Sequence, residues 1–284
     1  MPRKNKLVMP VVKWVGGKRQ LLDEIISRLP KTYGTYYEPF FGGGAVLFSV
    51  QPSKAVINDL NSALITTYKT IKDKPEELIE DLKKHENTSD YFYKIRNEDL
   101  DSEKFSQKND VQVASRLIYL NKTCFNGLFR VNSSGHFNTP FGNYKNPNIV
   151  NEPVIKAVSN YFNDSNITLL SGDFYTACKT AVRGDFVYLD PPYDPVSDTA
   201  SFTGYNAGGF DSNEQVRLRD LCVELDKNGI KFMLSNSNTK FINDIYDDKY
   251  FNNKITIEVV KAKRSINSNG NKRGEVEEVL IRNY

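Results

Sequence analysis

The stretch that decides the fold is Phe186-Val187-Tyr188-Leu189-Asp190-Pro191-Pro192-Tyr193. Its first four residues form a short apolar run of aromatic and branched side chains, which is typical of a buried parallel strand. The prolines end the strand because neither has an N–H to continue the ladder. Asp190 and Tyr193 should therefore lie at the carboxyl end of a strand, where open α/β sheets bind their ligands. A plain Pro-rich turn with Asp190 as turn former explains the same residues. The other motifs along the chain must therefore decide between a ligand site and a simple turn.

The composition indicates a folded protein of a reducing compartment. Of the 284 residues 39% are apolar, which suits one large domain or two modest ones. No apolar run approaches the ~20 residues that cross a bilayer, and the basic start of the chain lacks the apolar segment of a signal peptide. Cys124, Cys178 and Cys222 are too widely spaced for a disulfide framework or a zinc motif. We therefore expect a cytoplasmic protein that does not bind membranes.

Histidine content and charge narrow the function classes. His85 and His136 are the only histidines, which argues against a His-based triad and a multi-histidine metal site, although a carboxylate-only site stays open. The net charge of +3 does not by itself indicate nucleic acid. Residues 261–273 contain several basic side chains and no acid. Such a loop is either simply solvated or in contact with phosphate.

Two glycine-rich turns precede helical patterns. Gly16-Gly17-Lys18 leads into a helix that Pro30 closes, and its glycines allow the backbone to approach an anion. Farther on, a strand at 35–40 leads into Phe41-Gly42-Gly43-Gly44 and a second helix. Strand, glycine turn and helix form the first βα unit of a nucleotide-binding domain. The only tryptophan, Trp14, serves either in core packing or as a flat wall against a ligand ring.

The second strand of this unit ends at an acid. Residues 55–58 form the strand, and Asp59 follows it 17 residues after Gly42 (59 − 42). Nucleotide-binding folds hold ribose hydroxyls with an acid at about this distance. Asp59 would alternatively cap the helix that begins near Asn61. The glycine turn upstream favours the ribose role.

The middle of the chain has a different character. Residues 62–150 are largely helical, with a helix that starts at Pro75 and another at about 111–122, whereas 86–110 is polar and expected to be loop-rich. Alternating side chains around Asn132-Ser133-Ser134-Gly135 predict a β-hairpin. The side chains on and beside it suit base edges and phosphates: Asn126, Arg130, Asn138, Tyr144 and Lys145. Alternatively, the hairpin is an exposed surface element with no role in binding.

After this insert the α/β pattern resumes. A strand at 167–171 ends at Gly172-Asp173, and a helix at about 213–227 precedes the strand 230–234. Strands near 255–260 and 276–281 are joined by a connection too short for a helical crossover, so we expect an antiparallel pair. The prediction is an α/β fold with a Rossmann-like, mostly parallel sheet and an antiparallel last strand. Residues 1–61 and 151–284 would form one domain and 62–150 the inserted helical one.

Together these motifs resemble the Dam family of DNA adenine-N6 methyltransferases, in the alpha-group order of cofactor motif, recognition insert and catalytic motif. The resemblance spans nearly the whole chain. The matching segments are Lys13-Trp14-x-Gly-Gly-Lys18, Glu38-Pro39-Phe40-Phe41-Gly42-Gly43-Gly44, Asn58-Asp59, Asn126-Gly127-Leu128-Phe129-Arg130 through Pro140-Phe141-Gly142, Asp190-Pro191-Pro192-Tyr193, Ser201-Phe202-Thr203-x-Tyr205 and 264–270. The fold implied is that of S-adenosylmethionine-dependent methyltransferases.

The resemblance implies S-adenosylmethionine as cofactor, S-adenosylhomocysteine as product and no metal. The residues that match or neighbour cofactor contacts of the family are Trp14, Lys18, Phe40, Gly42, Gly44, Asp59 and Asp190. Asp59 would accept hydrogen bonds from the ribose hydroxyls. Asp173 either contacts the cofactor or caps a turn.

The expected chemistry follows from the target. The adenine amino lone pair is delocalised into the ring, and acceptors for both N6 hydrogens would localise it for attack on a methyl sulfonium. Asp190 and the Pro191 carbonyl are placed for this, and alignment of nitrogen, methyl carbon and sulfur supplies much of the remaining advantage. The base must be flipped out of the duplex, and Tyr193 would stack on it.

DNA recognition is also implied by the resemblance. The hairpin is similar to that of enzymes that read GATC, with Arg130 on a guanine, a contact worth ~1–3 kcal/mol of discrimination. Other matched positions are Lys13 at an outer base pair, Phe125 and Asn126 at the gap left by the flipped base, and Leu128, Pro140 and Tyr144 in the recognition segment. Lys263 and Arg264 would contact phosphates.

Two other functions stay open at this point. An RNA adenine-N6 methyltransferase is disfavoured by the hairpin, because the major groove of A-form RNA is too narrow for such a reader. A non-catalytic DNA-binding protein on the same scaffold is disfavoured by the intact Asp190-Pro191-Pro192-Tyr193 motif. A restriction endonuclease that cuts the same site is a possible functional partner, and the sequence does not separate this case from a solitary methylase.

Overall fold

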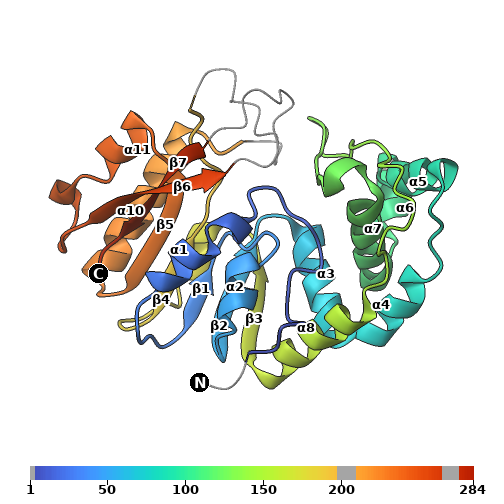
Figure 1. Cartoon of the computed structure of the whole chain (residues 1–284), viewed down its shortest axis with the longest axis horizontal. Coiled ribbons are helices and arrows are strands. Elements are labelled where there is room, and N and C mark those ends of the chain that lie inside the picture. Colours follow the sequence, from blue (N-terminus) through green and yellow to red (C-terminus); the bar gives the residue numbers. More distant parts are fainter. Residues whose placement is uncertain (1–3, 197–208, 264–274) are drawn as a thin grey trace.

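The computed structural model describes residues 4–196, 209–263 and 275–284, and in the described part it contains one mixed sheet of seven strands in the order β3-β2-β1-β4-β5-β7-β6 (Figure 1). The strands are β1 (Tyr36–Glu38), β2 (Lys54–Asp59), β3 (Asn166–Ser171), β4 (Phe186–Leu189), β5 (Lys231–Ser237), β6 (Thr256–Lys263) and β7 (Glu275–Arg282). Strands β1 to β5 are mutually parallel, whereas β7 is antiparallel to both β5 and β6. The predicted α/β sheet with an antiparallel last strand is confirmed.

Strand β4 is buried on both faces, which explains its continuous apolar run. Phe186 and Tyr188 pack into one core cluster, together with α1 (Leu22–Ser27), α2 (Ala45–Val50) and α8 (Glu152–Asp164). Val187 and Leu189 point the other way into a second cluster. That cluster is covered by α9 (Phe174–Cys178), α10 (Ser212–Lys227) and α11 (Lys240–Ile245). The alternation places the strand at the centre of a three-layer sandwich.

The helical region contains α3 (Ser62–Asp73), α4 (Pro75–Leu82), α5 (Ser89–Arg96), α6 (Ser102–Ser106) and α7 (Asp110–Thr123). Short 3₁₀ turns occur at η1 (Lys18–Gln20), η2 (Asn97–Leu100), η3 (Phe125–Gly127) and η5 (Asp248–Tyr250). Helix α7 packs against α3, α4 and α5, as Figure 1 shows beside the sheet. In the described ranges, no helix combines the length and apolar character needed to cross a membrane.

The expectation of a loop-rich segment at 86–110 is wrong, because α5 and α6 lie there. Side chains of Thr88 and Asp101 accept hydrogen bonds from the first turns of these helices and thereby start them. Phe92 and Ile95 are buried in a small cluster with residues of α7. Two buried positions give no sustained helical period, so the helix is revealed only by the packing partner of Phe92 and Ile95.

The predicted hairpin is present at residues 130–138, and we call it the recognition hairpin after the role that the sequence predicts for it. The Asn132 N–H donates to the His136 carbonyl at 2.9 Å, and the Asn138 N–H donates to the Arg130 carbonyl at 3.0 Å. Val131 and Phe137 form an isolated antiparallel bridge. Gly135 has φ +81°, the left-handed conformation that such a turn requires.

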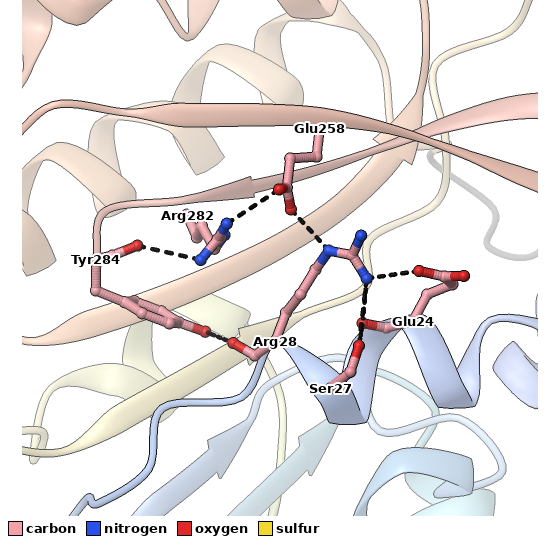
Figure 2. A network of polar contacts seen from close by, with 6 residues as sticks. All are labelled: Glu24, Ser27, Arg28, Glu258, Arg282 and Tyr284. Carbon is pink, nitrogen blue, oxygen red and sulfur yellow. Dashed lines mark hydrogen bonds and ion pairs between the residues drawn. The ribbon is translucent and has the colours of Figure 1, made fainter.

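A polar network ties the C-terminal strands to the N-terminal helix (Figure 2). Glu258 of β6 accepts a hydrogen bond from Arg28 at 2.7 Å and pairs with Arg282 of β7 at 3.1 Å. The Tyr284 hydroxyl donates to the Arg28 carbonyl at 2.9 Å. The Arg28 hydrogen bond is the main favourable cause that lowers the pKa of Glu258. The network therefore holds the antiparallel pair against α1, directly after the segment that carries Lys18.

Candidate active site

The carboxyl ends of β1, β2, β4 and β5 gather the predicted catalytic and cofactor residues at one edge of the sheet. The parallel register pairs Leu189 with Leu234, so the residues that follow, Asp190 and Ser235, become neighbours. The antiparallel register pairs Ser237 with Glu278 and brings Glu278 to the same edge. This edge is where parallel sheets bind their ligands.

Asp190 uses one carboxylate oxygen for internal contacts. Its Oδ1 accepts a hydrogen bond from the Ser235 hydroxyl at 2.9 Å and pairs with the Lys18 ammonium at 2.8 Å. Within the described ranges, its Oδ2 has no hydrogen-bond partner. Burial raises the pKa of Asp190, and the Lys18 charge is the largest effect that opposes the rise. The contacts thus orient the carboxylate and leave its second oxygen as an available acceptor.

Tyr193 is fixed through its hydroxyl. The hydroxyl donates to Glu278 Oε2 at 2.7 Å, and the Lys18 ammonium lies 4.3 Å from the centre of the ring. A cation over an aromatic face is a favourable contact. The same Lys18 side chain, only 8% exposed, therefore contacts both side chains of the predicted catalytic motif.

The backbone of residues 190–194, which we call the catalytic loop, is held by buried amide side chains. Gln215 of α10 donates to the Pro192 carbonyl at 2.9 Å. Asn236 of β5 accepts from the Asp194 N–H at 2.9 Å and donates to Gln215 Oε1 at 3.0 Å. Gln215 and Asn236 are at most 1% exposed. Because the two amides also satisfy each other, the loop rests on a complete buried network.

The glycine turn after β1 presents bare backbone. Gly42 and Gly44 have φ of +52° and +72°, and a Cβ on Gly42 would lie 2.9 Å from the Trp14 ring. The Gly42 N–H donates to Asp59 Oδ2 at 2.8 Å. Asp59 Oδ1 accepts from the Asn61 N–H at 2.8 Å, while the Asn61 side chain, and not Asp59, caps α3. Burial raises the pKa of Asp59. Asp59 therefore holds the turn closed from the end of β2.

Phe40 and Asp173 lie at the adjacent strand ends. The Phe40 ring stacks on Phe174 with 5.1 Å between ring centres. Asp173 caps α9 through the Tyr175 N–H and makes two contacts with Arg217 at 2.6 and 2.8 Å. The Arg217 hydrogen bond is the largest cause that lowers the pKa of Asp173. Of the two roles expected for Asp173, the capping one is present, and its carboxylate is also engaged by an arginine.

The predicted DNA-contacting residues of 125–144 are mostly exposed. Phe125 and Tyr144 are large aromatic side chains with exposed fractions of 55% and 38%. The Phe125 N–H donates to the Pro140 carbonyl at 2.9 Å, which joins the two ends of the segment. Asn126 adopts the left-handed conformation at φ +58°. Leu128 is half-buried, whereas Phe125, Asn126 and Tyr144 are exposed.

The recognition segment is joined to the predicted cofactor segment. The Trp14 ring stacks on Phe129 with ring centres 4.7 Å apart. The Asn121 side chain of α7 accepts from the Lys13 N–H and donates to the Lys13 carbonyl, both at 2.8 Å. Trp14 therefore contacts both the glycine turn and the helical region. This position agrees with both predicted roles of Trp14, namely core packing and a flat surface against a ligand ring.

Comparison with known proteins assigns the family. The model of the D12 class N6 adenine-specific DNA methyltransferases matches residues 14–266. The chain is 45% identical to the type II methyltransferase M1.LlaDCHI of Lactococcus lactis subsp. cremoris, over 99% of this chain and 98% of that protein. It is 41% identical to M.MjaIII of Methanocaldococcus jannaschii, over 98% and 99%. It is 32% identical to the DNA adenine methylase of Escherichia coli K12, over 98% and 95%.

The chain belongs to the D12 family of adenine-N6 DNA methyltransferases. It is a site-specific DNA adenine methyltransferase, as the motif order predicts, and it acts on DNA. In this methyltransferase, Asp190, Tyr193 and Lys18 come together in direct contact. Trp14, Gly42 and Asp59 form a second group at the neighbouring strand ends.

The residues that support the catalytic loop of the methyltransferase were missed from the sequence. They are Ser235, Asn236, Gln215 and Glu278. The polar run Ser235-Asn236-Ser237 at the end of an apolar strand was the available signal. Among the predicted phosphate contacts, Arg264 lies outside the described residues, and Lys263 is the last residue of β6, where only the backbone is described.

Proposed function

We propose that this DNA adenine methyltransferase transfers a methyl group from S-adenosylmethionine to N6 of a flipped adenine in duplex GATC. The observation that carries the proposal is the arrangement of Asp190, whose Oδ1 is held by Ser235 and Lys18 while Oδ2 has no partner in the described part of the chain. An oriented acceptor of this kind suits one hydrogen of an amino group. The Pro191 carbonyl follows directly in the chain and would take the other.

The residues around the glycine turn fit the cofactor. Gly42 is half-buried beside the Trp14 ring, so its backbone is accessible and a side chain there would collide with that ring. Gly44 is buried against Phe41, where a side chain would not fit. Asp59, although it accepts two backbone N–H groups, keeps further lone pairs for ribose hydroxyls. When bound, the cofactor would supply an electrophilic methyl group.

The base pocket would be formed by the catalytic loop. Tyr193, anchored by Glu278, would stack on the flipped adenine and replace part of the stacking lost from the duplex. Lys18 lies over the Tyr193 ring, so the base would replace this cation on the ring face. Lys18 would keep its ion pair with Asp190 Oδ1 and would also contact the cofactor, as the family resemblance implies.

Target choice would lie in the recognition hairpin and the segment that follows it. Arg130 is exposed and its Nε donates to Asn138 Oδ1 at 2.7 Å. A bidentate contact with guanine would replace this contact within the hairpin. Lys13, Phe125, Asn126, Leu128, Pro140 and Tyr144 would surround the target, and Lys263 and Arg264 would contact phosphates. We place this role in a recognition domain of residues 62–150, with 1–61 and 151–284 as the catalytic domain.

A partner endonuclease is part of the proposal. Two of the relatives are named as type II methyltransferases, and the chain is more similar to them than to the methylase of E. coli. This supports a functional pairing with a restriction enzyme of the same site specificity.

The test uses the purified protein, S-adenosylmethionine and matched duplexes. One duplex contains GATC and the others carry a single changed base pair in that site. We expect N6-methyladenine in the GATC duplex by mass spectrometry, and altered cleavage by nucleases that are sensitive to adenine methylation. Methylation of a different site would overturn the GATC assignment, and activity only on structured RNA would overturn the choice of substrate.

A further inference from the structure

The recognition hairpin has little internal support of its own. Its described strands share the single bridge between Val131 and Phe137 and the two backbone hydrogen bonds that flank the turn. A two-stranded hairpin of this size is marginally stable unless something else holds it. Its position must therefore come from contacts with the helical region.

Apolar packing supplies only part of that support. Phe137 is buried among residues of α5 and α7, and Phe129 stacks on Trp14. Beside these contacts lies an open hollow of about 450 Å³, bordered by the hairpin, the start of α3 and the face of α7. Of the hairpin residues that line this hollow, Phe137 alone belongs to the buried cluster. One apolar anchor leaves the orientation of the hairpin to be set by a directed contact.

Asp99 provides a directed contact. Its Oδ2 accepts a hydrogen bond from the Phe137 N–H at 3.0 Å, and the same oxygen lies 3.0 Å from Arg116 Nη2. Arg116 is itself fixed, because its guanidinium donates to the Ile95 and Arg96 carbonyls at 2.9 and 2.7 Å. The carboxylate and the guanidinium are 12% and 11% exposed. A charged and nearly buried chain of contacts therefore runs from α5 and α7 into the hairpin.

The contact point lies next to the side chain that holds Arg130. Asn138 follows Phe137 directly, and its Oδ1 accepts from Arg130 Nε at 2.7 Å. The other oxygen of Asp99, Oδ1, is buried and lacks a hydrogen-bond partner in the described ranges, with His136 Nδ1 at 4.0 Å. Asp99 therefore faces the hairpin at two successive residues, His136 and Phe137, where the chain leaves the turn.

We propose that Asp99 is a positioning residue for target recognition: held by Arg116, it sets the place of the recognition hairpin and so of Arg130. The inference rests on the proposed role of Arg130 in reading the target. The removal of the charge should loosen the hairpin over the hollow. The catalytic loop and the glycine turn, with which Asp99 makes no hydrogen bond or ion pair in the described ranges, should keep their geometry.

The experiment compares Asp99→Asn and Asp99→Ala with wild type on a GATC duplex and on duplexes with one changed base pair. Asp99→Asn keeps the shape and one acceptor, and we expect about a 10-fold rise in KM for DNA, with a larger rise in Asp99→Ala. Discrimination against changed sites should fall in parallel. At saturating DNA, kcat and the affinity for S-adenosylhomocysteine should stay within twofold. Asp90→Asn, at an exposed acid of α5, is the matched control and should behave as wild type.

A double-mutant cycle with Arg130→Ala separates positioning from general support. If Asp99 acts through Arg130, its replacement should cost little further discrimination once Arg130 is absent. Equal losses in both backgrounds, or loss of cofactor affinity together with DNA affinity, would overturn the inference. If Arg130→Ala itself binds and discriminates as wild type, the proposed function of the hairpin fails. If Arg130→Ala is defective and both Asp99 variants are not, only the role of Asp99 fails.

Discussion

The catalytic loop (190–194) and the recognition hairpin (130–138) both carry side chains proposed to touch the substrate, yet they are held in different ways. Side chains of three separate elements hold the catalytic loop: Gln215 of α10, Ser235 and Asn236 of β5, and Glu278 of β7. The hairpin borders a hollow, and Asp99 binds its backbone at Phe137.

The difference matches the two tasks. Methyl transfer needs acceptors that are already in place, because reorganisation during the reaction would add to the barrier. A reader of DNA must first follow the shape of the duplex and then exchange internal contacts, such as that between Arg130 and Asn138, for base edges. Changes in the catalytic loop should therefore lower kcat, and changes in the hairpin should raise KM and lower discrimination.

The largest effect should follow Asp190→Ala. The loss of the oriented acceptor should lower single-turnover methyl transfer about 10²- to 10³-fold, the usual effect of removing one group that stabilises developing charge. Binding of S-adenosylhomocysteine, measured by calorimetry, should be weakened but detectable. Asp164→Ala, at an exposed residue of α8, is the control. Turnover retained in Asp190→Ala would remove this residue from the mechanism. The catalytic loop would then not differ from the recognition hairpin in the way proposed.

Arg130→Ala should have a smaller effect, and this effect should be on site discrimination and not on kcat. The loss of one bidentate contact should reduce discrimination between GATC and a site with a changed guanine by about 10- to 100-fold, as expected for 1–3 kcal/mol. Competition binding with labelled duplexes measures this, and kcat on saturating GATC should change little. Arg183→Ala changes an exposed arginine before β4, at the opposite edge of the sheet, and should have no effect. A fall in kcat without a change in discrimination would contradict the separation of tasks.

Gln215→Leu should lower kcat about 10-fold with little change in KM for DNA. The substitution leaves the Pro192 carbonyl and the Asn236 amide without partners, and each unpaired buried group costs ~1–3 kcal/mol. Thermal stability should fall as well, as a melting curve will record. Gln107→Leu, at an exposed glutamine after α6, is the matched control. A rise in KM for DNA alone would show that the loop is not held for chemistry.

The smallest effect should be a shift of the pH profile in Lys18→Met. In the proposed mechanism Asp190 is ionised and accepts two internal contacts and a substrate hydrogen, and burial already raises its pKa above the ordinary value near 3.8. Lys18 opposes that rise, so its loss should raise the pKa further and move the acid limb of kcat to higher pH. Measurements need saturating cofactor, with Lys227→Met at an exposed lysine of α10 as control. An unchanged acid limb would mean that another group limits the rate.

Local patterns were enough to predict much of the sheet and part of the site. The apolar run 186–189, the glycine turn after β1 and Asp59 at the end of β2 are contiguous signals, and the structure places them at the same edge. The antiparallel pair β6 and β7 followed from a short connection. Helix starts such as Pro75 are also local, because capping and fixed φ act within one turn.

The supporting contacts were beyond such reasoning. The Asp194–Asn236 and Phe137–Asp99 hydrogen bonds join residues 42 and 38 positions apart. Neither Asn236 nor Asp99 stands in a sequence motif. The role of each becomes visible only from its contact with a distant segment. Helix α5 was missed for a related reason, since its buried side chains, Phe92 and Ile95, are recognised as core residues only once α7 packs against them.

By itself the sequence determined which chemistry this protein carries, because Asp190-Pro191-Pro192-Tyr193, the glycine turn and Asp59 are each defined within a few residues of chain. Only the tertiary structure decided which oxygen of Asp190 is engaged, what anchors the Tyr193 ring and how the recognition hairpin is held. Those properties depend on strand register and on charged contacts between distant segments. Both arise from the packing of the whole chain, which no local pattern encodes.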